Sequence, residues 1–189
     1  MKGKLIVFSG PSGSGKTTIV KALLMKVDLN AEFSVSAASR EKRYNEVDGK
    51  DYYFLSPEEF KNQIAKNAFV EWEEVYKNSF YGTLYSEIDR ITSQGKNVFF
   101  DVDVKGGIHI KEKFAKDCLT IFVMPPSVEV LETRLRNRAT ESEESLIKRL
   151  SKAKYEMTFS VKFDHVVIND HLEQAIDRAY KFVKEFTEI

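Results

Sequence analysis

Residues 10–17 (GPSGSGKT) have the spacing of a loop that can hold a phosphate group. Their glycines let backbone N–H groups converge on one anion, and the N-terminus of a following helix would add its positive dipole end. Lys16 would reach the outer phosphates of a nucleoside triphosphate, and the Thr17 hydroxyl would bind Mg²⁺. The residues expected to contact the nucleotide here are Gly10, Pro11, Ser12, Gly13, Ser14, Gly15, Lys16 and Thr17.

The segments on either side of this loop have the patterns that a phosphate site needs. Residues 4–9 (KLIVFS) form a short β-branched apolar run, which predicts a buried strand. Residues 16–27 show helical spacing of their apolar positions, which are Ile19, Val20, Leu23, Leu24 and Val27. A glycine-rich turn that matched the pattern by accident would lack this strand, loop and helix order.

Short apolar strands then alternate with amphipathic helices along the chain. The expected strands are 97–102, 119–124 and 164–168, and the expected helices are 85–93, 127–135, 145–157 and the C-terminal segment from Leu172. This alternation predicts an α/β fold whose parallel sheet is covered on both faces. The less regular segment before residue 84 contains a capped helix start at Ser56-Pro57 and is interpreted as an inserted substrate-side subdomain.

Composition and charge exclude several classes of protein. The 189 residues contain 29 Lys plus Arg and 29 Asp plus Glu, so no overall field attracts nucleic acid or membrane, and anion binding must be local. No apolar run approaches the roughly 20 residues of a membrane helix. The single cysteine, Cys118, excludes an internal disulfide and favours a cytoplasmic, reducing location.

A phosphate loop alone does not identify the group that accepts the phosphate. Residues 103–106 (DVKG) spell D-x-x-G, a pattern that GTPases use near the γ-phosphate, and water would then be the acceptor. The pattern is loosely defined, and no N-K-x-D segment for reading a donor guanine is present. A chance match explains D-x-x-G better.

Further motifs, in order along nearly the whole chain, resemble those of the guanylate kinases. They are FSVSAASR, R-x-x-E-x-x-G-x-D-Y-x-F, FVEW, YGT, DVDVKG, PPS, RATESEES and VVIND. The resemblance implies a P-loop core of about five parallel strands, an inserted mixed α/β GMP-binding subdomain and a short lid. The implied parts are a core of residues 1–33, 84–135 and 158–189, an insert of residues 34–83 and a lid of residues 136–157.

The resemblance also implies a GMP site that can be checked against guanine chemistry. Guanine presents an N1–H and a 2-amino group side by side, and a carboxylate such as Glu71 accepts both, whereas the unprotonated N1 of adenine would repel it. Ser36 and Thr83 are the implied hydroxyl partners of the base, with Asp103 as a second acceptor near the amino group. The implied clamp for the GMP phosphate consists of Arg40, Arg43, Tyr52 and Tyr81.

The same resemblance assigns the charges around the transferred group. Asp101 would either act through water on Mg²⁺ or orient Lys16. The residues expected to take part in the transfer are Lys16, Arg43, Asp101, Arg134, Arg138 and Arg149, of which the cationic ones would stabilise charge. Asn169 is the expected contact on the adenine side. Departures from the usual pattern occur at Lys105 (usually glutamine), Ala139 (usually glycine) and Thr83 (usually serine).

The expected activity is therefore Mg²⁺-dependent transfer from ATP to GMP, and to dGMP, by a monomer or homodimer without nucleic-acid or membrane partners. A kinase acting on a phosphorylated sugar is the nearest rival, but it would not need the guanine-reading set of Glu71 and Ser36. A guanylate-kinase-like interaction module is another rival, although such modules typically lack the phosphate loop that is complete here.

Overall fold

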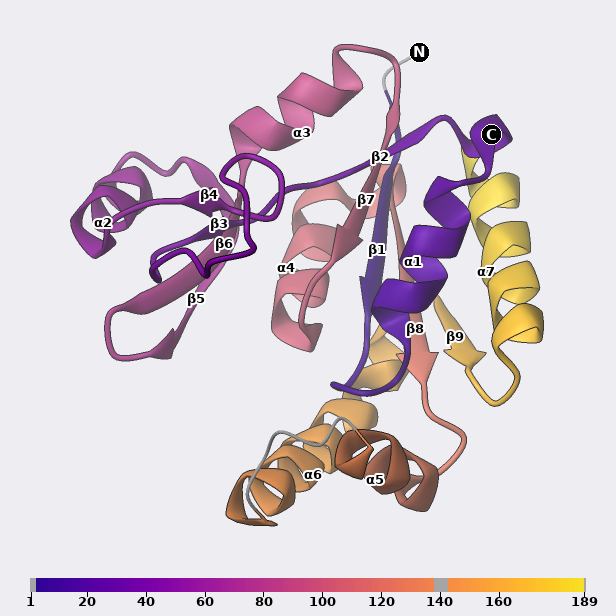
Figure 1. Ribbon diagram of the computed structural model, residues 1–189. Helices are drawn as coiled ribbons and strands as arrows, with labels where there is room; N and C mark the ends of the chain where they lie inside the picture. Colours follow the sequence, from indigo (N-terminus) through magenta and orange to yellow (C-terminus); the bar gives the residue numbers. More distant parts are fainter. Residues whose placement is uncertain (1–2, 138–142, 189) are drawn as a thin grey trace.

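The centre of the protein is a sheet of five parallel strands. The computed structural model describes residues 3–137 and 143–188. In spatial order the strands are β2 (Ala31–Phe33), β7 (Asn97–Asp101), β1 (Leu5–Ser9), β8 (Cys118–Met124) and β9 (His165–Ile168). The predicted parallel core is confirmed. Because β1 is the middle strand, the loop that follows it emerges at the centre of the sheet's carboxyl edge (Figure 1).

Helices and short 3-10 turns connect and cover the strands. In chain order they are α1 (Lys16–Leu24), η1 (Val27–Leu29), α2 (Pro57–Ala65), α3 (Tyr85–Thr92), α4 (Val104–Phe114), η2 (Ala115–Asp117), α5 (Val128–Arg136), α6 (Glu143–Met157), η3 (Thr158–Lys162) and α7 (Leu172–Thr187). Among the described residues, none of these helices combines the length and the apolar character needed to cross a membrane.

Alternate residues of β1 determine which helices cover each face of the sheet. Ile6 and Phe8 pack with residues of α1 and α7 on one face. Leu5 and Val7 pack with residues of α3 and α4 on the other face, where Cys118 is also buried. The sheet is therefore covered on both sides, which explains why its strands are continuous apolar runs (Figure 1).

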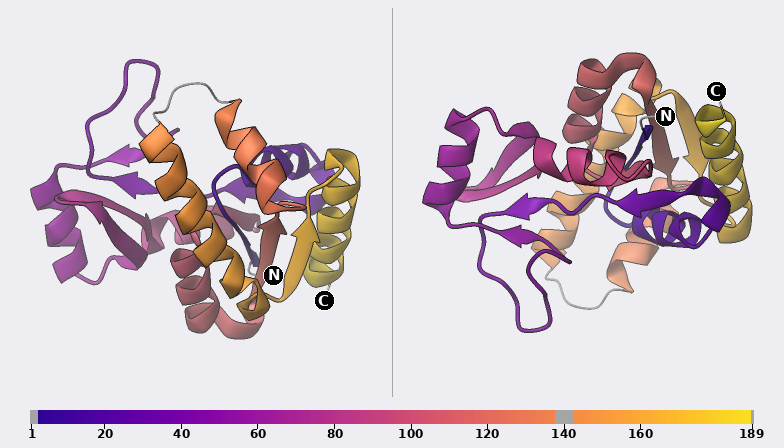
Figure 2. Two further views of the ribbon diagram at one scale, coloured as in Figure 1. Left: turned by 90° about the horizontal axis from the view of Figure 1, so that it is seen from below. Right: turned by 90° about the horizontal axis from the view of Figure 1, so that it is seen from above.

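A second, mixed sheet lies beside the first and is built from the chain between β2 and α3 (Figures 1 and 2). In spatial order its strands are β4 (Tyr53–Phe54), β3 (Ala37–Ala38), β6 (Ser79–Leu84) and β5 (Phe69–Tyr76). Phe60 of α2 stacks on Phe69 and Phe80, with ring centroids 4.3 and 5.4 Å apart. These stacked rings give the second sheet a small core of its own.

The start of α2 follows the pattern that the sequence predicts. The Ser56 hydroxyl accepts a hydrogen bond from the Glu59 N–H at 3.1 Å, and the Glu59 carboxylate accepts one from the Ser56 N–H at 2.7 Å. Pro57 occupies the first turn, where its missing N–H leaves no helical hydrogen bond unmade. The helix start at Ser56-Pro57 is confirmed.

Helices α5 and α6 form a pair below the carboxyl edge of the parallel sheet (Figures 1 and 2). Leu131 and Leu135 of α5 pack against Leu146 and Ala153 of α6. The pair thus brings one face of α6 toward the loop after β1. Arg138 and Ala139, between the two helices, lie outside the described residues.

Two local features differ from the sequence-based expectation. Helix α1 ends at Leu24, and Val27 is 92% exposed, whereas Leu29 in the turn η1 is buried instead. Helix α4 was not predicted, because its sequence VKGGIHIKEKF contains two glycines, which disfavour helix. Close packing against β1 explains why the second of these positions is a glycine, since a Cβ at Gly107 would lie 2.6 Å from the Ser9 hydroxyl oxygen.

A buried carboxylate, Glu87 of α3, joins the two sheets. It is 2% exposed, and its oxygens accept hydrogen bonds from the Val35 N–H and the Tyr53 hydroxyl, each at 2.9 Å. Arg90 donates two more, at 2.8 and 2.9 Å. Burial alone would raise the pKa of Glu87, but the hydrogen bonds from Arg90, Val35 and Tyr53 outweigh it and hold that pKa below its usual value.

We predict that Glu87→Ala lowers the free energy of unfolding by on the order of 3 kcal/mol, because it leaves several buried donors without an acceptor. Urea denaturation followed by circular dichroism measures this. Because the folded-state pKa is lowered, the stabilisation is present at neutral pH and is lost as pH falls, so the difference from the parent chain should shrink in acid. The control Glu32→Ala, which removes the other partner of Arg90, should cost about 1 kcal/mol or less. An equal loss in both variants would contradict the assignment.

Candidate active site

The backbone of residues 10–17 forms a tight cradle between β1 and α1. Gly10 and Gly15 have φ angles of 142° and 93°. A Cβ at Gly10 would lie 2.3 Å from the Val123 carbonyl oxygen, and one at Gly15 would lie 2.1 Å from the side-chain nitrogen (Nδ2) of Asn169. Only glycine fits these positions. The tight backbone that results lets the loop N–H groups and the N-terminus of α1 point toward one site, which suits binding of a phosphate.

Asp101 meets the loop from the end of the neighbouring strand β7. Its carboxylate accepts a hydrogen bond from the Thr17 hydroxyl at 2.6 Å and lies 3.5 Å from the Lys16 ammonium. The Lys16 ammonium also donates to the Gly10 carbonyl at 3.1 Å. A hydroxyl and a carboxylate oxygen beside a phosphate cradle are ligands that suit Mg²⁺, which usually keeps waters and phosphate oxygens as its other ligands. The residues present therefore fit a magnesium ion, and Asp101 is the carboxylate on the loop side.

Two arginines approach the loop from α5 and α6. Arg134 donates to the Asn169 carbonyl at 2.9 Å, and the Asn169 side chain donates to the Ser14 carbonyl at 2.7 Å. The other terminal nitrogen of Arg134 is buried without a hydrogen bond among the described residues. Arg149 donates to the Ser12 hydroxyl at 2.5 Å. The guanidinium groups of Arg134 and Arg149 therefore lie on two sides of the loop, and Arg134 has one terminal nitrogen that donates no hydrogen bond to the described residues.

Two adjoining cavities lie at the carboxyl edge of the sheet. The first, of about 680 Å³, is lined by Gly10, Ser12, Lys16, Tyr76, Asp101, Val102, Asp103, Ser145, Lys148, Arg149, Lys152 and Glu156. The second, of about 320 Å³, is lined by Ser36, Tyr52, Glu71, Glu73, Val75, Tyr81, Gly82, Asp101, Val102, Asp103 and Lys152. We call them the loop cavity and the acceptor cavity. They share Asp101, Val102, Asp103 and Lys152, so a group bound in one faces the other.

Glu71 forms a wall of the acceptor cavity. Burial raises its pKa to about 7; a hydrogen bond from Thr83 opposes this effect and the nearby charge of Asp103 adds to it. The Thr83 hydroxyl, which is fully buried, donates to the Glu71 carboxylate at 2.7 Å. A carboxylate held in place with free lone pairs, in a largely buried setting, can read adjacent N–H donors on a ligand.

Asp103 lines both cavities and begins α4 as its N-cap. Its carboxylate accepts from the Gly106 N–H at 2.8 Å. A hydrogen bond to Asp103, together with burial, raises the pKa of the facing Glu73. The Lys105 ammonium lies 3.2 Å from Glu73. The cation at Lys105 is thus paired with Glu73 at the rim of the acceptor cavity.

The arginines expected to clamp the acceptor phosphate do not line the acceptor cavity. Both terminal nitrogens of Arg40 contact the Glu46 carboxylate, at 2.6 and 2.7 Å. This pairing lowers the pKa of Glu46 to about 2. The Arg43 N–H donates to Glu46 at 2.9 Å, while its side chain is exposed. Glu46 therefore accepts hydrogen bonds from both arginines. Its position three residues after Arg43, in the R-x-x-E segment, could have suggested this role.

Ten of the 21 expected site residues line the two cavities. Tyr52 and Tyr81 line the acceptor cavity with ring centroids 6.0 Å apart. Arg138 lies outside the described residues. The loop cavity is also lined by Lys148, Lys152 and Glu156, which no sequence motif marks. Their spacing along α6 places them on the helix face that carries Arg149. This helical spacing, which can be read from the sequence, could have identified them as residues of the site.

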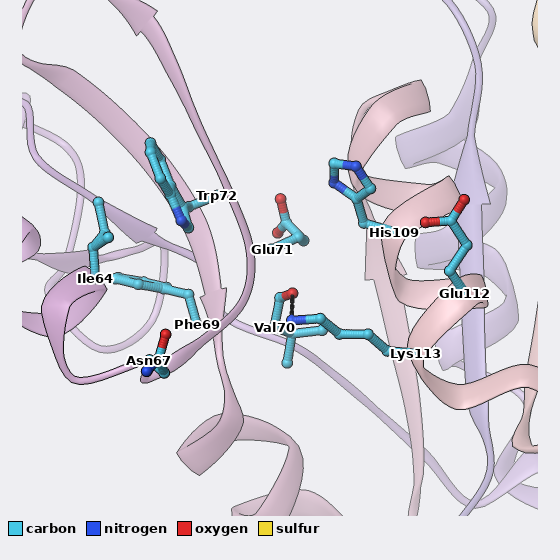
Figure 3. A pocket seen from close by; sticks show the side chains of 9 residues that line it. All are labelled: Ile64, Asn67, Phe69, Val70, Glu71, Trp72, His109, Glu112 and Lys113. Carbon is cyan, nitrogen blue, oxygen red and sulfur yellow. Dashed lines mark hydrogen bonds between the residues drawn. The ribbon is translucent and has the colours of Figure 1, made fainter.

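A third cavity, of about 480 Å³, lies behind Glu71, between β5 and α4 (Figure 3). Trp72 and His109 stand on opposite sides of it, and the Lys113 ammonium donates to the Val70 carbonyl. None of the loop residues lines it. This cleft marks the junction between the second sheet and the core, and Glu71 separates it from the acceptor cavity.

Comparisons with known proteins agree with this geometry. A family model described as Guanylate kinase matches residues 2–186. The guanylate kinase of Bacteroides thetaiotaomicron is 50% identical over 186 residues, covering 98% of this chain and 91% of that protein. That of Thermotoga maritima is 42% identical over 184 residues, covering 97% and 87%. The crystal structure of guanylate kinase from Anaplasma phagocytophilum matches with a TM-score of 0.77 and 29% identity, covering 100% of this chain and 88% of that one.

A phosphate loop at the carboxyl edge of a parallel sheet, facing a second cavity in an adjoining mixed sheet, is the arrangement of a nucleoside monophosphate kinase. The family match covers nearly the whole chain. The chain belongs to the guanylate kinase family.

We predict that Thr83→Val raises the pH at which Glu71 titrates by about one pH unit, because the hydroxyl hydrogen bond that stabilises the charged carboxylate is worth ~1.5 kcal/mol. The valine has nearly the same shape, so the cavity should keep its form. Titration of ¹³C-labelled glutamate carboxyls by NMR measures the shift. Thr92→Val, whose hydroxyl bonds the Ile88 carbonyl away from the site, is the control. A Glu71 midpoint unchanged in Thr83→Val would refute the contact.

Proposed function

We propose that this chain transfers the γ-phosphoryl group of ATP to GMP, giving ADP and GDP, within purine nucleotide metabolism. Membership of the guanylate kinase family supports the reaction. The structural observation that carries it is the continuity of the loop cavity with the acceptor cavity, whose wall holds the Glu71 carboxylate. The proposal includes dGMP as a second acceptor.

The proposed step is an in-line displacement at phosphorus. An oxygen of the GMP phosphate forms a bond to the γ-phosphorus as the bond to the β–γ bridging oxygen breaks, and ADP leaves with that electron pair. A phosphate monoester has its second pKa near 6 and is mostly dianionic near pH 7. No strong general base is therefore needed, and catalysis consists of positioning and charge compensation.

On the donor side, residues 10–17 hold the ATP phosphates, and Asn169 lies at the adenine side. Thr17 and Asp101 are the proposed magnesium residues, and a bound Mg²⁺ would neutralise charge on the β- and γ-phosphates. Asp101 also orients the Lys16 ammonium, as their 3.5 Å separation supports. The arginines proposed to stabilise charge on the transferred group are Arg43, Arg134, Arg138 and Arg149.

On the acceptor side, Glu71 accepts the guanine N1–H and 2-amino donors. Ser36, Thr83 and Asp103 complete the base contacts, and Tyr52, Tyr81, Arg40 and Arg43 hold the phosphate. We propose that the insert (residues 34–83) and the lid (residues 136–157) close on the core (residues 1–33, 84–135 and 158–189). Closure would exclude water, which would otherwise hydrolyse ATP.

The proposal places the enzyme in the cytoplasm, as a monomer or homodimer. The single cysteine is buried, and burial raises the pKa of its thiol to about 12, so it has no reactive role. A reducing compartment suits a chain without disulfides.

We predict that ADP release, measured with a coupled enzyme assay, depends strongly on GMP and on Mg²⁺. AMP should stimulate the reaction at least 100-fold less, because the adenine N1 lone pair faces the Glu71 carboxylate. Equal stimulation by AMP, or ADP release that ignores GMP, would overturn the proposed function.

Glu71→Gln should raise KM for GMP by roughly 10–100-fold, since one charged hydrogen-bond acceptor becomes a donor that faces guanine N–H groups. KM for ATP should change less than threefold. Glu112→Gln changes an exposed carboxylate in the cleft behind Glu71 and should behave like the parent chain. Unchanged GMP kinetics in Glu71→Gln would refute the base-reading role.

The same carboxylate predicts a pH dependence. Since burial raises the Glu71 pKa to about 7, the acceptor-competent ionised form is lost as pH falls below 7. The kcat/KM for GMP should then fall about tenfold per pH unit below that value, with kcat/KM for ATP less affected. The GMP phosphate titrates near pH 6 whichever protein is used. The pH profile of Glu71→Gln should therefore keep the fall in kcat/KM near pH 6 and lose the fall near pH 7 that the parent chain shows. Identical profiles for the two proteins would contradict the assignment.

A further inference from the structure

Lys152 of α6 lies where three cavities meet. It lines the loop cavity and the acceptor cavity, and also a smaller cavity of about 110 Å³ under α4. Its side chain is 62% exposed, and its ammonium is 3.7 Å from the Glu156 carboxylate. The separation is long and the Lys152 side of the pair is open to solvent, so the pair contributes little to stability. The ammonium is therefore available to a ligand that occupies the junction.

The carboxylates of the acceptor cavity favour a cation at this junction. Its lining includes the carboxylates of Glu71, Glu73, Asp101 and Asp103. Within the described part of the chain, Lys152 is the only lysine or arginine that lines this cavity. A phosphate dianion that enters it meets like charge, which disfavours binding unless a cation compensates.

Other cations near the junction are already engaged. The Lys16 ammonium lies 3.5 Å from the Asp101 carboxylate, on the loop side. Arg40 is paired with Glu46 and lies 5.0 Å from the ring centroid of Tyr52, at the wall of the cavity, and Lys105 pairs with Glu73 at its rim. The field of Lys152 does reach the acceptor side. Burial would raise the pKa of Asp103, but hydrogen bonds with Glu73 and Gly106 and the charge of Lys152 outweigh it.

Helix geometry places Lys152 as the acceptor-side counterpart of Arg149. The two residues are three apart on α6 and share a face of the helix. Arg149 reaches the loop at Ser12, whereas Lys152 reaches the acceptor cavity. One helix face thus presents a cation to each side of the point of transfer.

We propose that Lys152 is a further catalytic residue of this enzyme, whose ammonium contacts the phosphate of bound GMP and compensates the surrounding carboxylates as the phosphoryl group arrives. The inference rests on the proposed function, since it requires GMP in the acceptor cavity. In the transfer, the attacking oxygen of the GMP phosphate stays beside the ammonium as its new bond to phosphorus forms. Lys152 keeps its proton throughout and supplies charge only.

Calorimetric titration tests the contact without turnover. For Lys152→Gln, GMP should bind 10–100-fold more weakly, while guanosine, which lacks the phosphate, should bind as it does to the parent chain. Weakening of both ligands would show that Lys152 only shapes the cavity and would overturn the proposal, as would unchanged binding of GMP. Lys152→Arg, which keeps the charge, should recover most of the GMP affinity, and failure to do so would also count against it.

Steady-state kinetics supply the second readout. Lys152→Gln should lower kcat/KM for GMP by 10–100-fold and change KM for ATP less than twofold. Lys154→Gln, an exposed lysine on the same helix that lines none of these cavities, is the matched control. Kinetics within twofold of the parent chain would overturn the role of Lys152. Absence of GMP-dependent ADP release from the parent chain would instead overturn the proposed function, so the two failures are distinguishable.

Discussion

The close approach of the phosphate loop to its neighbours is the constraint on which the site depends. At Gly10 the backbone passes the end of β8, and at Gly15 it passes the Asn169 side chain, so neither position has room for a Cβ. Since β1 is the middle strand, these contacts fix the loop relative to the strands beside it. The start of α1, the carboxylate of Asp101 and the arginine of α5 are all placed against the loop that results.

Charge is arranged locally in a chain with equal numbers of acidic and basic residues. The loop side concentrates Lys16 and the arginines of α5 and α6, with Asp101 as the nearest carboxylate. The acceptor side is acidic, which suits the proposed reading of guanine by carboxylates, whereas the phosphate of GMP would need cations. A site of this kind requires cations that reach in from other elements. Arg40, held by Glu46, and Lys152, at the junction of the cavities, illustrate two ways in which the fold supplies them.

Much of the fold could be predicted from local patterns. Apolar runs and helical spacing are properties of neighbouring residues, so the parallel core and the capped start of α2 followed from the sequence. The end of α1 and the presence of α4 did not. Val27 continues an apolar spacing, but its side chain is exposed and, among the described residues, packs against nothing in the core. Helix α4 contains two glycines that disfavour helix, and one of them, Gly107, fits closely against β1. In both places packing between distant segments outweighs local propensity.

For the site, the sequence by itself determined the phosphate loop, and it predicted the proposed Mg²⁺ ligand Thr17 and, through resemblance, the proposed set of residues around guanine. These are short contiguous motifs, whose chemistry depends on order along the chain. Only the tertiary structure decided that Asp101 accepts the Thr17 hydrogen bond beside the loop, whereas Asp103 caps α4, although both carboxylates line both cavities. It also showed that Glu46 holds Arg40 outside that cavity and that Lys152 enters it. These facts depend on distances between separate elements, and such distances are set by packing rather than by the spacing of residues in sequence.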